Sequence, residues 1–290
     1  MKHFLKIILN KFQSLILRIY SICTFPISIF FILSSKNIHK SYKMSFFRKF
    51  FLGLKMLRNC RHITTGTSYK VHLVMALKLL ELSPEIEGDV IECGTWKGGS
   101  AANLSLICKI VGRKLLIYDS FEGLPEGDSH DRQASSYLKG DFAGSLEDVR
   151  KNIKQYGVIE QCTFVKGWFN DTLPQLKNKI VLAFLDVDIE ASLNTCVLYV
   201  WPQMIDGGYL FTDECTALDY VALFFSEKWW LKNFNSVPPG LIGAGTGLPL
   251  GMFYIGPMLE MGDHFFQRPS SGGYTRKGWE NVWTYYPDEF

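Results

Sequence analysis

Residues 89–104 read DVIECGTWKGGSAANL, and this stretch decides the fold. Asp89–Cys93 predicts a short buried strand, and Ser100–Val111 predicts a helix because its apolar residues recur at helical spacing. The glycines between them allow the backbone to approach a ligand closely, although an ordinary glycine-rich β–α turn has the same composition. Their spacing is GxxxGG and not GxGxxG, which disfavours a dinucleotide-binding dehydrogenase.

The same alternation of strands and helices continues along the chain. Further helices are predicted at Tyr69–Ser83, between Ser145 and Gly157, and at Leu193–Met204. Further strands are predicted at Lys114–Tyr118, Cys162–Val165, Ile180–Leu185 and Tyr209–Thr212, with a closing hairpin strand at Gly251–Ile255. Apolar strands separated by helices are typical of an α/β protein with a Rossmann-like, doubly wound, mostly parallel sheet. Ligands of such sheets bind beyond the carboxyl ends of the strands.

Composition excludes several classes of protein. The 290 residues allow one large domain or two small ones, and 31 basic against 28 acidic residues give a net charge of +3. That charge is too small to favour nucleic acid as a partner. The seven cysteines form no CxxC pair and no cluster with histidine, so we expect reduced, intracellular thiols and no structural zinc.

The first 50 residues form a hydrophobic N-terminal segment. Residues 19–35 carry no charge, and lysines and arginines flank them on both sides. This pattern predicts a short membrane span or a helix lying at the inner face of the membrane, with the bulk of the chain in the cytoplasm. The alternative is a hydrophobic helix packed on its own domain or on a second subunit of a homo-oligomer.

Candidate ligand-binding residues lie at the ends of the first three predicted strands. Glu92 would suit a cation, such as the amino group of an aminoacyl ligand. Asp119 stands where ribose hydroxyls are commonly bound, and Trp168 could stack on a flat base. Each has a structural alternative, as a turn, a cap or a core aromatic. Together they favour an adenosine-type ligand.

Four acidic residues follow the fourth and fifth strands. These residues, Asp186, Asp188, Asp213 and Glu214, should converge at one edge of the sheet. Their repulsion would raise their pKa values, and a hard divalent cation would relieve it, although one aspartate could instead cap the following helix. The polar stretch 128–140 is compatible with a mobile lid over the site or with a solvated loop.

Four stretches together resemble the macrocin O-methyltransferase family. They read VIECGTWKGGSAANL, LLIYDSFEGLPEGD, VKGWFNDTLP and LAFLDVDIEASLNTCVLYVWPQMIDGGYLFTDE. The resemblance runs from about residue 62 to 256. It divides the chain into the hydrophobic segment 1–50, a methyltransferase domain 51–256 and a C-terminal tail 257–290.

The resemblance implies a class I methyltransferase fold that uses S-adenosyl-L-methionine and Mg2+ or another hard divalent cation. It implies Glu92, Gly94 and Ser100 on the methionine side of the cofactor, Asp119 and Ser120 at the ribose, and Gly167, Trp168 and Phe169 at the adenine. It also implies Asp186, Asp213 and Glu214 as metal ligands and Asp188 as the general base. Glu214 stands where the family commonly has aspartate, and Glu190 stands where it commonly has an aromatic residue.

The expected activity is methyl transfer to a hydroxyl group, above all of a sugar in a glycoconjugate or glycosylated metabolite. A membrane-bound N-terminus would make a lipid-linked acceptor suitable. The alternatives are methylation of an aromatic diol, an amine or another small molecule, and a degenerate methyltransferase fold that only binds.

Overall fold

The computed structural model describes residues 25–126, 137–214, 218–244, 252–254 and 272–279, together with Ile19 and Cys23. Eight strands form one sheet in the order β3-β2-β1-β4-β5-β8-β6-β7. The first five are parallel, and β8, β6 and β7 are antiparallel to their neighbours. The strands are β1 (Asp89–Cys93), β2 (Leu115–Asp119), β3 (Cys162–Lys166), β4 (Ile180–Leu185), β5 (Met204–Thr212), β6 (Ile242–Ala244), β7 (Met252–Tyr254) and β8 (Gly273–Arg276).

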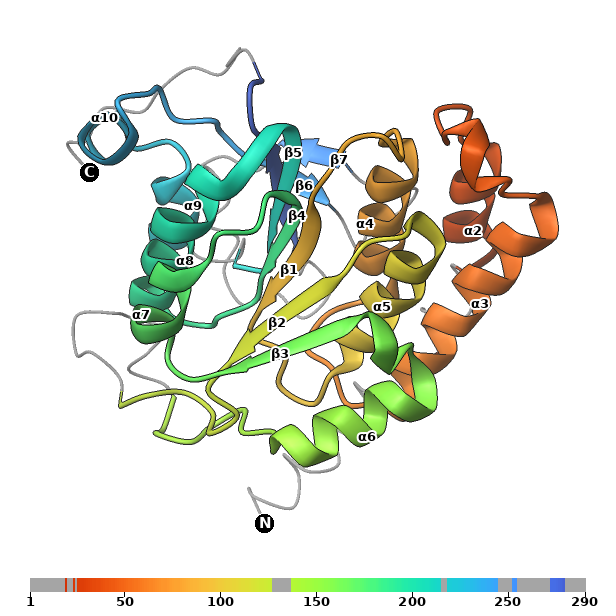
Figure 1. Ribbon diagram of the computed structural model, residues 1–290, viewed down its shortest axis with the longest axis horizontal. Helices are drawn as coiled ribbons and strands as arrows, with labels where there is room; N and C mark the ends of the chain where they lie inside the picture. Colours follow the sequence, from red (N-terminus) through yellow and green to blue (C-terminus); the bar gives the residue numbers. More distant parts are fainter. Residues whose placement is uncertain are drawn as a thin grey trace.

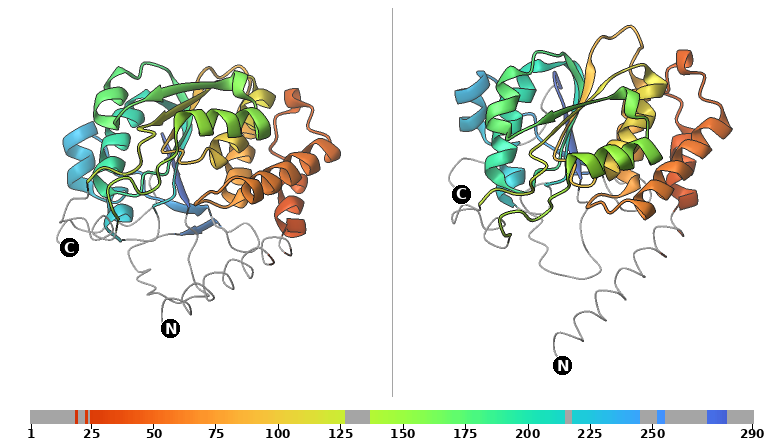
Figure 2. Two further views of the ribbon diagram at one scale, coloured as in Figure 1. Left: turned by 90° about the horizontal axis from the view of Figure 1, so that it is seen from below. Right: turned by 60° about the horizontal axis from the view of Figure 1, so that its bottom comes forward.

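Helices cover both faces of the sheet, as Figures 1 and 2 show. One face carries α4 (Tyr69–Glu81), α5 (Gly99–Val111) and α6 (Leu146–Tyr156), and α2 (Phe25–Ser34) and α3 (Phe46–His62) lie outside α4 and α5. The other face carries α7 (Phe169–Thr172), α8 (Glu190–Gln203), α9 (Leu218–Leu223) and α10 (Glu227–Phe234). Short 3-10 turns lie at Lys40–Tyr42, Ile159–Gln161 and Leu173–Gln175. The predicted doubly wound, mostly parallel α/β fold is confirmed.

The two faces of the sheet form separate hydrophobic cores. Successive residues of a strand point to opposite faces, so Leu115 and Ile117 pack with α4 and α5, whereas Leu116 and Tyr118 pack with α8. All six residues of β4 are buried, which is typical of a central parallel strand. The apolar runs of the sequence identify the strands because both of their faces are covered.

The predicted elements agree with the structure to within a few residues, and the largest differences lie at β5 and the antiparallel strands beyond it. This strand begins at Met204, five residues earlier than predicted: Met204 pairs with Ile180 of β4 before the register shifts to pair Tyr209 with Leu182. The predicted hairpin is present as β6 and β7, although Gly251 and Ile255 lie outside the described residues. The expected tail contributes β8, where Tyr274 is buried and stacks on Phe211 with ring centroids 5.1 Å apart.

Helix α2 packs on the α/β domain. Ile29 is buried and lies against Gly53 of α3, and the ring of Phe25 is 6.1 Å from those of Phe50 and Tyr69. No helix in the described ranges is both long and apolar enough to cross a membrane. The described part of the hydrophobic segment therefore fits the packing alternative, and residues 1–18 lie outside the described set.

A buried polar network joins α3, α4 and α5. Asn103 accepts a hydrogen bond from Asn59 Nδ2 at 2.9 Å, and its own amide contacts His72 Nδ1 at 2.8 Å and the carbonyl of Met56 at 3.2 Å. The other ring nitrogen of His72 lies 2.8 Å from Thr67 Oγ1. Burial lowers the pKa of His72 to about 3, so the imidazole is neutral. The network fixes α3 against the loop that precedes α4.

Replacing Asn103 with alanine should lower the free energy of unfolding by about 1–3 kcal/mol for each buried partner that it leaves unsatisfied. Urea unfolding of Asn103→Ala measures this loss. Asn178→Ala is the matched control, because Asn178 is exposed and its side chain donates one hydrogen bond, to Asp89. Equal midpoints for the two variants would contradict the structural role of the network.

Candidate active site

Glu92 is a buried carboxylate at the end of β1. It is 0% exposed, and neither of its oxygens has a hydrogen-bond partner among the described residues. The hydroxyl of Thr95, in the turn that follows, is also buried without such a partner. Burial raises the pKa of Glu92 to about 8, against a smaller opposite effect of the nearby Ser100 and Thr95 hydroxyls. A buried acceptor of this kind calls for a cationic or hydrogen-bond-donating ligand.

Gly94 allows the ends of β1 and β4 to meet. Its φ is +82°, and a Cβ there would collide with the carbonyl oxygen of Asp186. The backbone of Asp186 donates to the carbonyl of Cys93 at 2.9 Å, and Gly94 donates to the carbonyl of Tyr118 at 2.9 Å. This junction places the glycine-rich turn directly beside the acidic residues that follow β4.

Asp119, at the end of β2, holds two turns in place. Its Oδ2 accepts from the backbone of Thr95 at 2.7 Å and of Trp96 at 3.3 Å, and its Oδ1 accepts from the backbone of Phe121 at 2.6 Å. Burial raises its pKa, and these three bonds oppose that effect. A carboxylate offers about four acceptor positions, so ribose hydroxyls could still bind Asp119.

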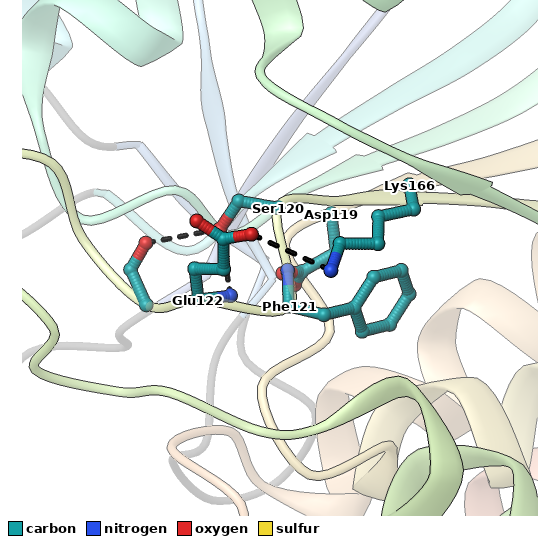
Figure 3. Close-up of polar contacts among 6 residues, drawn as sticks. Asp119, Ser120, Phe121, Glu122 and Lys166 are labelled. Atoms are coloured by element: carbon teal, nitrogen blue, oxygen red, sulfur yellow. Dashed lines mark hydrogen bonds and ion pairs between the residues drawn. The ribbon is translucent and has the colours of Figure 1, made fainter.

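Ser120 shapes the turn shown in Figure 3, donating to the carbonyl of Gly123 at 3.0 Å and accepting from the backbone of Glu122 at 3.1 Å. Glu122 also forms an exposed ion pair with Lys166 of β3, at 3.4 Å. The hydroxyl of Ser120 is thus already used within the turn. Its backbone remains beside Asp119 at the carboxyl edge of the sheet.

The residues after β3 separate into one exposed and one packed aromatic side chain. Gly167 has a φ of +145° and donates to the carbonyl of Asp119 at 3.0 Å, which joins this segment to the end of β2. Trp168 is 38% exposed, whereas Phe169 packs against the core on the α8 side of the sheet. Trp168 is therefore the better placed of the two to stack on a ligand.

The four acidic residues converge as expected. The pKa of Asp186 is raised by burial and by the neighbouring charges of Asp213, Glu214, Asp188 and Glu92. Burial and then the charge of Glu214 raise the pKa of Asp188 to about 7. Crowding of this kind is typical of functional sites, where a proton or a cation offsets the repulsion.

Glu214 has a structural role inside this group. Its Oε1 accepts from the backbones of Val187 at 2.6 Å and Asp188 at 2.8 Å, and its Oε2 accepts from Thr212 Oγ1 at 2.5 Å. Both oxygens are therefore turned toward the protein.

Across the described ranges, no three histidine, cysteine or acidic side chains are arranged to hold a metal ion.

Asp188 is held in an unusual backbone conformation. Its φ is +60°, in the left-handed region that few non-glycine residues adopt. Its backbone N–H is held by Glu214 and its carbonyl accepts from the Tyr220 hydroxyl at 3.1 Å. Strained residues held by several contacts often mark functional sites.

Sequence reasoning missed Thr95, Trp96 and Tyr220. Trp96 packs edge-on against Phe142 at 5.4 Å, beside the turn, and both have positive φ angles. Thr95 and Trp96 lie inside the stretch 89–104 but belong to no recognisable pattern of ligand-binding residues.

Most of the expected lid at 128–140 lies outside the described residues, which resume at Tyr137.

Comparison with known proteins gives consistent similarities. A family model described as Macrocin-O-methyltransferase (TylF) matches residues 65–235. The 8-demethyl-8-(2,3-dimethoxy-alpha-L-rhamnosyl)-tetracenomycin-C 4'-O-methyltransferase of Streptomyces olivaceus is 33% identical over 162 residues, and demethyldecarbamoylnovobiocin O-methyltransferase of Streptomyces niveus is 28% identical over 162 residues. Each match covers 49% of this chain and 62% of the relative, so less than two thirds of either relative is matched.

Among solved structures, that of the O-methyltransferase NovP superposes with a TM-score of 0.51 at 22% identity. The match covers 77% of this chain and 80% of that one. This similarity supports the fold.

The buried carboxyl of Glu92 should make stability depend on pH. Its pKa is about 8 in the folded chain against 4.5 for the free group, so the folded state binds the proton more tightly. The free energy of unfolding, relative to Glu92→Gln, should be highest below pH 4.5 and fall up to pH 8, by at most about 1.4 kcal/mol per pH unit.

Urea unfolding of the wild type and the variant across this range measures the difference. Glu87→Gln is the control, because the Glu87 side chain is 83% exposed. Parallel curves for wild type and Glu92→Gln would show that Glu92 does not titrate in this window.

Proposed function

The chain belongs to the macrocin O-methyltransferase family, and from this premise we propose that it transfers a methyl group from S-adenosylmethionine to a sugar hydroxyl in a glycoconjugate or glycosylated metabolite. The observation that carries the proposal is the buried, unsatisfied carboxyl of Glu92 beside the Gly94 turn, next to the acidic group that includes Asp188. The name of the Streptomyces olivaceus relative, which includes a rhamnosyl group, supports a sugar as the acceptor.

Residues of the first three strand ends would hold the cofactor. Glu92 would accept from its amino group, and the open backbone at Gly94 would lie against its methionine portion, with Ser100 nearby. Asp119 and Ser120 would face the ribose, and Gly167 and Trp168 would border the adenine, with Phe169 supporting Trp168 from the core. An amino group bound to Glu92 would favour its ionised form, so cofactor binding should release the proton held by the buried carboxyl.

Asp188 would act as the general base. A bound S-adenosylmethionine would supply the methyl group, and Asp188 would accept the proton that the acceptor hydroxyl loses on methylation. Burial holds the pKa of Asp188 above its ordinary value, so its carboxylate is basic enough to take the proton. The contacts of its backbone with Glu214 and Tyr220 would keep the carboxylate aimed at the acceptor.

We also propose that Asp186 and Asp213 hold a hard divalent cation such as Mg2+. A bound cation of this kind would lower the pKa of the acceptor hydroxyl and offset the crowding of carboxylates. Glu214 would support the loop from Val187 to Asp188 through the hydrogen bonds described above. Direct ligation by Glu214 would require those bonds to break.

Replacing Asp188 with asparagine should lower methyl transfer from S-adenosylmethionine to glycosylated acceptors by about 100- to 10,000-fold. Asparagine tolerates the left-handed backbone of this position, so the fold should be kept. Turnover is measured with radiolabelled cofactor, and calorimetric titration with S-adenosylhomocysteine should give one-site binding of nearly unchanged affinity.

The control variant is Asp171→Asn, because Asp171 is exposed. Wild-type turnover in Asp188→Asn would remove Asp188 from the base role, and absence of cofactor binding in the wild type would refute the proposed activity.

Removing metal with EDTA should lower turnover by about 100-fold or more, since metal assistance commonly supplies several kcal/mol in the transition state. Added Mg2+ should restore turnover in the wild type and in Asp171→Asn but not in Asp213→Asn. Binding of S-adenosylhomocysteine should change little in any of these conditions. Full activity after exhaustive metal removal would contradict the cation proposal and leave the methyltransferase proposal intact.

A further inference from the structure

The outer face of α3 exposes large apolar side chains. Phe46, Phe47, Phe51 and Leu54 are 60%, 68%, 61% and 41% exposed. Phe47, Phe51 and Leu54 follow one another at intervals of four and three residues, so they form a continuous stripe along one side of the helix. The opposite side of α3 packs on the protein through Leu52, Met56 and Leu57. The helix therefore has two apolar faces, and one of them faces solvent.

The exposed stripe is surrounded by positive charge. Arg48, Lys55, Arg58 and Arg61 are exposed on α3, and within the described ranges no carboxylate forms an ion pair with any of them. The N-terminal part of the sequence is strongly basic as a whole. Residues 1–80 contain 14 lysines and arginines and no aspartate or glutamate. The small net charge of the whole chain hides this asymmetry.

A recess of about 530 Å³ lies between α3 and α6 on the same side. Phe51, Leu54, Lys55, Arg58 and His62 line it from α3, and Tyr156 closes it from α6. Apolar and cationic groups thus stand side by side in a concave surface. This combination suits an amphiphile whose head group is negatively charged.

We propose that α3 docks this protein on the surface of an anionic phospholipid bilayer. Phe47, Phe51 and Leu54 enter the boundary between head groups and acyl chains, and Lys55, Arg58 and Arg61 contact the lipid phosphates. Within the part of the chain that the structure describes, the outer side of α3 is open to solvent, since the helix lies outside α4 and α5. It lies next to α2, where Phe30 is a further exposed aromatic at 68% (Figures 1 and 2).

Charge favours a bilayer over a second copy of the chain. A symmetric dimer through α3 would place two basic faces against each other, which is unfavourable. The docking surface also lies apart from the proposed catalytic group, so the proposal does not depend on methyl transfer. It differs from a transmembrane anchor, because it requires only a helix lying flat on the surface.

The test is sedimentation of the full-length protein with vesicles of phosphatidylcholine alone or with one third phosphatidylglycerol. The wild type should bind the anionic vesicles and lose affinity as salt rises. Replacing Lys55, Arg58 and Arg61 together with glutamine should weaken this binding about 100-fold, since each basic residue near the surface contributes about fivefold. The double variant Phe47→Ser, Phe51→Ser should also weaken it.

Two control variants make the test specific. Lys109→Gln, Lys177→Gln and Lys232→Gln together remove the same charge from exposed sites elsewhere and should leave binding unchanged. Lys55→Arg, Arg58→Lys and Arg61→Lys together should bind like the wild type. Equal losses in the α3 and control charge variants, or equal binding to neutral vesicles, would overturn the proposal. A wild-type dimer that Phe47→Ser, Phe51→Ser dissociates would assign the face to self-association instead.

Discussion

The site depends on the close approach of two strand ends, where the backbone of Gly94 lies against the carbonyl of Asp186. A side chain at Gly94 would push β1 and β4 apart and separate Glu92 from the acidic residues after β4. The hydrogen bonds from Asp186 to Cys93 and from Gly94 to Tyr118 extend this contact across three strands. One glycine therefore brings the proposed cofactor turn and the proposed catalytic group to one edge of the sheet.

The electrostatics of that edge follow from the same crowding. Glu92, Asp186 and Asp188 all have raised pKa values because burial and neighbouring carboxylates disfavour their charge. Asp119 is half-buried and Glu214 is buried, but their oxygens accept hydrogen bonds from backbone N–H groups and, at Glu214, also from the Thr212 hydroxyl. Some acidic residues at this edge therefore stabilise loops, and others are available to bind a ligand. The hydrogen bonds of each carboxylate distinguish the two groups.

The sequence was sufficient for the central fold because β1, β2 and β4 are buried on both faces and consist of short apolar runs. It also predicted which acids would converge, since the ends of parallel strands meet at one edge. It could not predict β8, because Gly273–Arg276 is a strand of only four residues whose pairing with β5 and β6 depends on tertiary contacts. Nor could it predict that Glu214 would turn inward, since this depends on where the N–H groups of Val187 and Asp188 point.

The position of β8 has a consequence for synthesis of the chain. β8 lies between β5 and β6, yet 60 residues separate it from the end of β5. At about 5–20 residues per second, a ribosome needs roughly 3–12 s to make that interval. During this time the edge of β5 lacks its native neighbour, and an open strand edge can pair with another chain. Nascent chains of this protein should therefore be most sensitive to chaperone supply while the ribosome translates the codons between these two strands.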